Sequence, residues 1–103
     1  MPPGDYDITG NIKAIESLKL ELLQSAVSLL KNMADQRQNR EDQLKNLSNI
    51  LTLAYMLAAR LNINLNTIDE KAAEDAKAHI LKDTHILTAD YSAVLRHITR
   101  RKP

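Results

Sequence analysis

Two asparagines stand three residues apart in an apolar stretch, residues 46–65, which reads NLSNILTLAYMLAARLNINL. Residues at i and i+3 of a helix share a face, so Asn46 and Asn49 are expected to point the same way. An amide that is buried without a hydrogen-bond partner costs roughly 1–3 kcal/mol. Three environments would explain the pair: the wall of a polar pocket, a hydrogen-bonded core position that sets helix register, or solvent.

The other residues that could do chemistry are scattered. His79, His85 and His97 lack the i, i+4 spacing of a helical metal site, so each is expected to be structural or exposed. No glycine-rich phosphate loop, nucleophile elbow or zinc motif occurs in the sequence. The last residues form a basic tail, Arg96, Arg100, Arg101 and Lys102. With a net charge of +1 and only three aromatic residues, all Tyr, nucleic acid is not expected as a partner.

Composition favours an all-α protein. Of the 103 residues none is Cys, Phe or Trp, which excludes a disulfide framework and a thiolate metal site. The two glycines, Gly4 and Gly10, lie near the start, whereas hairpin-rich folds need glycine at their turns. The longest apolar run, residues 47–59, is shorter than the roughly 20 residues of a membrane span. No targeting segment is visible, so a cytoplasmic protein is expected.

Apolar periodicity predicts helices over residues 9–33 and 41–61. Thr9 is the expected N-cap of the first, and Asn62 is expected to end the second in the left-handed conformation. The apolar stripe of the first helix follows i, i+3/i+4, i+7 spacing and consists of Ile12, Ile15, Leu18, Leu22, Ala26, Leu29 and Met33. Met33 and Met56 are expected to fill the core.

Two shorter helices are predicted after these. One covers residues 67–81 with Asn66 as N-cap, and the other follows Thr88. Their expected inward faces consist of Ile68, Ala72, Ala76, His79 and Ile80 in the first and Tyr91, Val94, Leu95 and Ile98 in the second.

Four helices joined by polar segments predict an antiparallel four-helix bundle. We expect a single domain over residues 1–103, with a flexible N-terminus at 1–8 and a basic tail at 101–103. A first helix of this length would span about 37 Å, whereas a compact domain of this size has a radius of gyration near 13 Å. One chain would therefore leave much apolar surface uncovered, which predicts a homodimer or homotetramer.

Residues 7–31, DITGNIKAIESLKLELLQSAVSLLK, together with LSNILTLAYMLAARLNINL, resemble the MazG-like family of all-α nucleoside triphosphate pyrophosphohydrolases. The most specific parts are IKAIESLKLELL and the close LAARLNINL, and the resemblance covers about residues 7–80. It implies an oligomeric helical bundle and Mg²⁺-dependent hydrolysis of a nucleotide to its monophosphate and pyrophosphate.

The resemblance also implies a metal site and places it. The family holds Mg²⁺ with a Glu-x-x-Glu pair on the first long helix and a Glu-x-x-Asp pair on the next. Here those pairs fall on Glu21 with Gln24 and on Asn46 with Asn49, so three of the four expected carboxylates are amides. Among the lysines, Lys19 and Lys71 are the candidates for phosphate binding, and Lys19 is alternatively a surface partner of Glu16.

The loss of charge has a predictable cost. Mg²⁺ prefers charged oxygens in octahedral geometry, and at about 4 Å each charge contributes up to roughly 4 kcal/mol at an effective dielectric near 20. Two functions therefore remain open. Either the chain is a MazG-type pyrophosphohydrolase with a weakened metal site, for which Glu16 or a partner subunit would supply a compensating carboxylate, or it is a catalytically inactive helical oligomer that binds a nucleotide or another protein.

Overall fold

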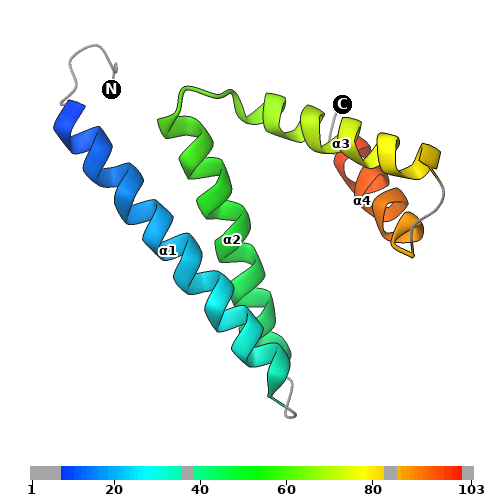
Figure 1. Cartoon of the computed structure of the whole chain (residues 1–103), viewed down its shortest axis with the longest axis horizontal. Coiled ribbons are helices and arrows are strands. Elements are labelled where there is room, and N and C mark those ends of the chain that lie inside the picture. Colours follow the sequence, from blue (N-terminus) through cyan, green and yellow to red (C-terminus); the bar gives the residue numbers. More distant parts are fainter. Residues whose placement is uncertain (1–7, 36–38, 83–85, 101–103) are drawn as a thin grey trace. The chain divides into compact units, whose positions relative to one another are not determined.

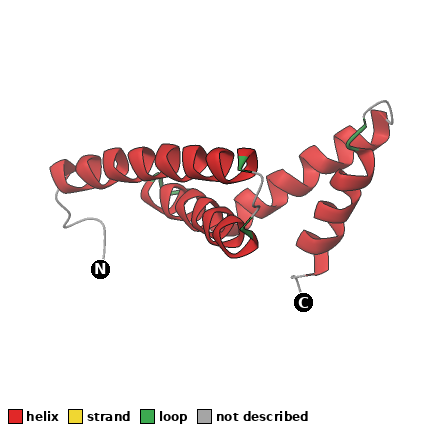
Figure 2. Ribbon diagram, turned by 90° about the horizontal axis from the view of Figure 1, so that it is seen from below, coloured by secondary structure: helices red, strands yellow, loops and turns green. Residues whose placement is uncertain are grey.

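The computed structural model describes residues 8–35, 39–82 and 86–100, and every regular element in these ranges is a helix (Figures 1 and 2). The helices are α1 (Ile8–Ala34), α2 (Arg40–Arg60), α3 (Leu65–Lys82) and α4 (Thr88–Arg100). The all-α prediction is confirmed. The predictions for residues 1–7, for His85 and for the tail at 101–103 fall outside the described residues.

The helices pack in two pairs, α1 with α2 and α3 with α4. The chain accordingly divides after Asn62 into two compact units, each built on one pair. In the first unit α2 turns back alongside α1 as a helical hairpin (Figure 1). The single domain and the four-helix bundle expected from the sequence remain predictions, since they concern how such pairs assemble.

Local side-chain chemistry sets the ends of α2. The Asn39 side chain accepts a hydrogen bond from the Asp42 backbone N–H at 3.3 Å, which satisfies a donor that the first turn would leave free. At the other end Asn62 has φ 62°, the left-handed conformation that asparagine tolerates better than most residues. The predicted role of Asn62 is confirmed.

Two predicted N-caps are wrong. Helix α1 already includes Ile8, so Thr9 lies inside it. Helix α3 begins at Leu65, and the Asn64 side chain accepts a hydrogen bond from the Asn66 backbone N–H at 2.8 Å. Asn64 is therefore the residue that caps α3. Both asparagines are good caps by residue type.

The buried core is small and consists of Leu18, Leu53, Ala58, Ala76 and Ile98. Several residues predicted to be inward are exposed, because one partner helix covers only one stripe of each helix; they are Ile12, Met33, Met56, Ala72 and Val94. Many other large apolar side chains are also exposed. No helix in the described ranges is long and apolar enough to cross a membrane.

Candidate functional site: a polar pocket between α1 and α2

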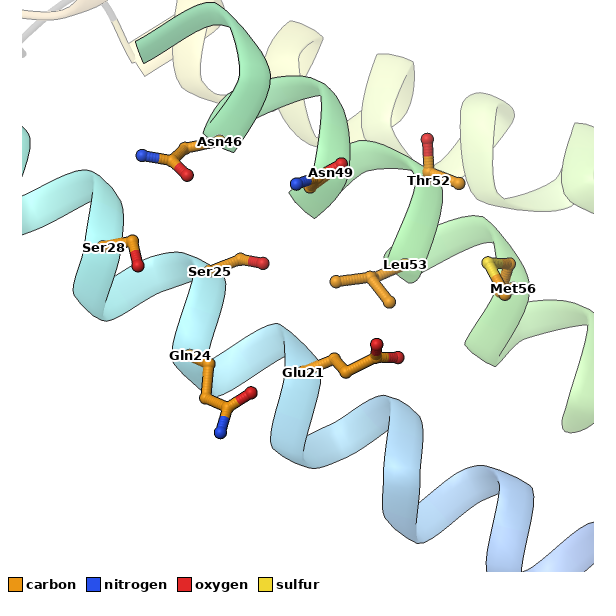
Figure 3. Close-up of a pocket in the computed structure, with 9 residues that line it drawn as sticks. All are labelled: Glu21, Gln24, Ser25, Ser28, Asn46, Asn49, Thr52, Leu53 and Met56. Atoms are coloured by element: carbon orange, nitrogen blue, oxygen red, sulfur yellow. The ribbon is translucent and has the colours of Figure 1, made fainter. Parts of the chain in front are cut away.

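A pocket of about 430 Å³ lies between the two helices of the first unit (Figure 3). Its walls are polar on both sides, with an apolar part contributed by α2. The lining residues are Glu21, Gln24, Ser25 and Ser28 from α1 and Asn46, Asn49, Thr52, Leu53 and Met56 from α2.

Helical spacing explains why these residues share one hollow. Positions three or four apart lie on one face of a helix, and both lining sets follow that spacing. The four residues to which the family resemblance assigned the metal site, Glu21, Gln24, Asn46 and Asn49, are thus brought around a single pocket. Ser25, Thr52 and Leu53 were missed by sequence reasoning, although the same spacing from Glu21 and Asn49 would have found them.

The side chains are oriented differently within the pocket. In Figure 3 the Glu21 carboxylate is directed toward the side where Leu53 and Met56 lie. The Asn46 and Asn49 amides extend into the space between the helices, whereas the Gln24 amide points away from α2. The Glu21 carboxylate and the Asn46 amide therefore lie toward opposite ends of the pocket, with Asn46 on the side of Ser28.

Asn46 holds the most unusual atom of the site. Its side chain is half-buried, and its Nδ2 is fully buried with no hydrogen-bond partner in the described structure. An unsatisfied buried donor costs about 1–3 kcal/mol. Asn49, by contrast, is exposed. The pair is not a set of hydrogen-bonded core amides: both residues line the pocket, and one carries an unmet donor.

The charge of the pocket comes from Glu21. No lysine, arginine or histidine is among the residues that line the described pocket. Within the described ranges the Glu21 carboxylate forms neither an ion pair nor a hydrogen bond. The Thr52 hydroxyl is already engaged, since it donates to the Ser48 carbonyl at 2.9 Å. The site therefore presents one negative charge, neutral amides and serine hydroxyls.

This donor set does not fit Mg²⁺. A dehydrated Mg²⁺ site relies on charged oxygens, and here one carboxylate faces amides. No group of three His, Cys, Asp or Glu side chains within the described residues could hold a metal ion.

The remaining candidates lie outside the pocket lining. Lys19 Nζ is 3.0 Å from Glu16 Oε2 in an exposed pair, as the alternative reading of Lys19 predicted. Lys71 Nζ is 3.6 Å from Asp75 Oδ1 on α3, in the second unit. A phosphate-binding role for either lysine, and a compensating role for Glu16, stay predictions.

His79 has a structural role. Its ring stacks on Tyr91 with centroids 4.3 Å apart, and its Nδ1 lies 2.8 Å from the Asp75 carbonyl oxygen. His97 is exposed on α4. Both agree with the expectation that the histidines are structural or exposed.

Comparison with known proteins gives one clear relationship. No curated protein and no solved structure matches the chain significantly. A family model, that of the MazG-like family, matches residues 8–94, a span that takes in α1, α2, α3 and the first half of α4. With the pocket lying where the family resemblance put its site and the match covering most of the chain, the protein belongs to the MazG-like family.

Proposed function

We propose that this MazG-like chain is a catalytically inactive helical oligomer whose α1–α2 pocket binds a small ligand without metal-dependent hydrolysis. One observation carries the proposal. The pocket that contains the four residues to which the resemblance assigns the metal site is lined by a single carboxylate, Glu21.

The chemistry of nucleotide cleavage explains why a single carboxylate is not expected to support catalysis. In such reactions the metal bridges phosphate oxygens and neutralises charge that develops on them, while a carboxylate or similar group orients the attacking water. Without the metal, the several negative charges of a triphosphate would face Glu21, with no cation among the lining residues. Both the binding and the hydrolysis of such a substrate are then disfavoured.

The exposed apolar surface supports the oligomer. Along α1 the residues Leu20, Leu23, Val27 and Leu30 are exposed at i, i+3, i+7, i+10 spacing. Along α2, Leu44, Leu47 and Leu51 begin the same pattern. Such stripes are the usual seam between packed helices, and monomers rarely expose large contiguous apolar patches. A homodimer or homotetramer would cover them and complete an antiparallel bundle.

Light scattering on the purified chain tests the assembly. A dimer or tetramer is the expected mass. A monodisperse monomer would contradict the argument from exposed apolar surface, and would leave the proposal for the pocket to stand separately.

The loss of catalysis is tested by restoring the charges. We compare the wild type with the triple variant Gln24→Glu/Asn46→Glu/Asn49→Asp, which recreates the family's carboxylate pairs. The measurements are pyrophosphate release from a panel of nucleoside triphosphates and the melting temperature with and without Mg²⁺ or Mn²⁺. The wild type should show neither release nor a metal-induced rise, whereas the triple variant should gain the rise.

A matched control adds acids on the same helices outside the pocket, through Ser17→Glu and Ser48→Glu. This variant should not respond to the metal. Wild-type pyrophosphate release that Glu21→Gln abolishes would overturn the proposal in favour of a MazG-type pyrophosphohydrolase.

A further inference from the structure

We infer that two copies of the chain associate through one face of the α1–α2 hairpin, the face turned away from the polar pocket, and that the pocket stays open to solvent in the assembly. The inference rests on the proposed function, which calls for an oligomer without saying which side of the hairpin the copies share. The apolar face, as we call it, consists of Leu23, Val27 and Leu30 of α1 and Leu44, Leu47 and Leu51 of α2.

On α1 the apolar face and the pocket lie on opposite sides of the line that contacts α2. That line is marked by the buried Leu18 and, three turns later, by the half-buried Leu29. Successive residues of a helix are about 100° apart. Ser28, which lines the pocket, and Leu30, which is exposed, therefore fall on opposite sides of Leu29.

The same division holds on α2. Its contact line includes the half-buried Ile50 and the buried Leu53. Asn49 lines the pocket on one side of Ile50, and the exposed Leu51 lies on the other side. The pocket joins one side of α1 to one side of α2. The remaining two sides must then also meet, so the exposed leucines of both helices share one face of the hairpin.

The alignment of the two helices makes this face continuous. In Figure 3, Asn46 lies at the level of Ser28, and Asn49 lies at the level of Ser25. Because α2 runs back along α1, the same alignment applies on the apolar face. Three pairs of positions are then level with one another: Leu30 with Leu44, Val27 with Leu47 and Leu23 with Leu51.

The size of the apolar face suits the centre of a protein–protein interface. Its six side chains are 41–68% exposed. With seven residues of rise along each helix and axes 8–10 Å apart, the face covers on the order of 300 Å². A standard interface buries about 800 Å² per partner, of which a little over half is apolar. The apolar face would supply the larger part of that apolar area.

A second copy of the hairpin is the occupant that fits. All six side chains are Leu or Val, so a two-fold axis would bring apolar groups together and the face itself would contribute no charge. Among the described residues of the first unit, the buried side chains are those of Leu18, Leu53 and Ala58. So small a core leaves a helical pair in need of further packing whenever the chain folds. Another copy of the same chain meets that condition.

Thiol labelling tests which side of the hairpin is covered. The chain has no cysteine, so a single introduced cysteine reports on one position. Val27→Cys lies on the apolar face and Ser28→Cys in the pocket lining, and both positions are exposed in the single chain. Each rate of reaction with a maleimide is compared with that of the same variant unfolded in urea. We expect the Val27→Cys thiol to be slowed by about tenfold or more and the Ser28→Cys thiol to be slowed little.

Charges placed on the apolar face should separate the copies. The double variant Leu23→Glu/Leu47→Glu should raise the dissociation constant by about a hundredfold or more, because association would bury carboxylates. Light scattering should then give at most half the wild-type mass. The matched control is Leu81→Glu, which makes the same change at an 84% exposed position of α3 and should keep the wild-type mass.

The outcomes distinguish this inference from the proposed function. Persistence of the oligomer in Leu23→Glu/Leu47→Glu, or its dissociation in Leu81→Glu as well, overturns the assignment of the face and leaves the proposed oligomer intact. Equal protection of the Ser28→Cys and Val27→Cys thiols overturns the open pocket. These two cysteine variants are small changes at exposed positions, so they remain decisive if the glutamate variant unfolds. A monomeric wild type overturns both the interface and the oligomer.

Discussion

The two helical pairs use their facing surfaces in different ways. Helices α1 and α2, of 27 and 21 residues, place Leu18 and Leu53 in the core but give part of the interface to a polar pocket. Helices α3 and α4, of 18 and 13 residues, bury Ala76 and Ile98 and add the stacked rings of His79 and Tyr91.

The difference is between an interface that contains a polar pocket and one that is packed throughout by a small residue and an aromatic stack. In the first pair an unpartnered donor, Asn46 Nδ2, is buried at a cost that packing alone would not require. In the second pair a small residue and an aromatic stack bring the helices together. The proposed function is assigned to the first pair, and substitutions in the two pairs should behave differently.

The largest effect is expected at the core of the first pair. Leu18→Ala should lower the free energy of unfolding by about 2–5 kcal/mol, because Leu18 is 6% exposed and truncation leaves a cavity. Urea denaturation at fixed protein concentration measures it. Ser17→Ala, at the neighbouring exposed position, is the control. Equal effects of the two would mean that Leu18 is not a core residue.

In the second pair, a larger side chain at the buried position 76 should destabilise the protein. Ala76 is 2% exposed, so Ala76→Leu should cost about 1–3 kcal/mol through overpacking. Ala78→Leu places the same side chain at an exposed position of α3 and should change the urea midpoint little. If Ala76→Leu proves neutral, the packing of α3 on α4 is looser than described.

Asn46→Leu should stabilise the protein, whereas the two core substitutions destabilise it. Removing an unsatisfied buried donor should raise the free energy of unfolding by about 1 kcal/mol. Thermal and urea unfolding measure the change, with Asn49→Leu at an exposed position as the control. Loss of stability in Asn46→Leu would show that the amide has a partner in solution.

A smaller effect is expected from the aromatic stack of the second pair. Ring pairs contribute about 0.5–1.5 kcal/mol beyond their buried area. A double-mutant cycle with His79→Leu and Tyr91→Leu isolates this term from the other contacts of each residue. A coupling energy indistinguishable from zero would show that the contact between the two rings does not stabilise the protein.

The smallest effects are expected at two exposed ion pairs, one in each pair of helices. Lys19→Ala and Lys71→Ala should each change the free energy of unfolding by less than about 0.5 kcal/mol, since solvent screens both pairs. A marked loss of nucleotide affinity in either variant would instead support the phosphate-binding role predicted for these lysines.

Much of the fold was predictable because its determinants are local. The predicted bounds of α1 and α2 differ from the observed ones by one residue at each end. Apolar spacing and polar breaks set those bounds, and Asn62 ends α2 through its own backbone preference. The cap of α3 was predicted wrongly, as Asn66 instead of Asn64. Residue type alone does not distinguish between two nearby asparagines, so the exact start of this helix could not be predicted.

The candidate site was predictable only in outline. Helical spacing puts Glu21 with Gln24, and Asn46 with Asn49, on shared faces, and the family resemblance suggested that the faces meet. The residue pattern of one helix does not show which side chains of another helix pack against it. The hollow, its apolar side at Leu53, and the direction of Gln24 depend on the packing of α1 against α2.

The sequence alone therefore established the helices, their apolar faces and the shortage of carboxylates, since these follow from residue identity and short-range periodicity. Tertiary packing decided that Asn46 Nδ2 is buried without a partner and that Glu21 stands as the one charge of a pocket. The reason is that burial and hydrogen bonding depend on groups distant in the chain, which no local pattern encodes.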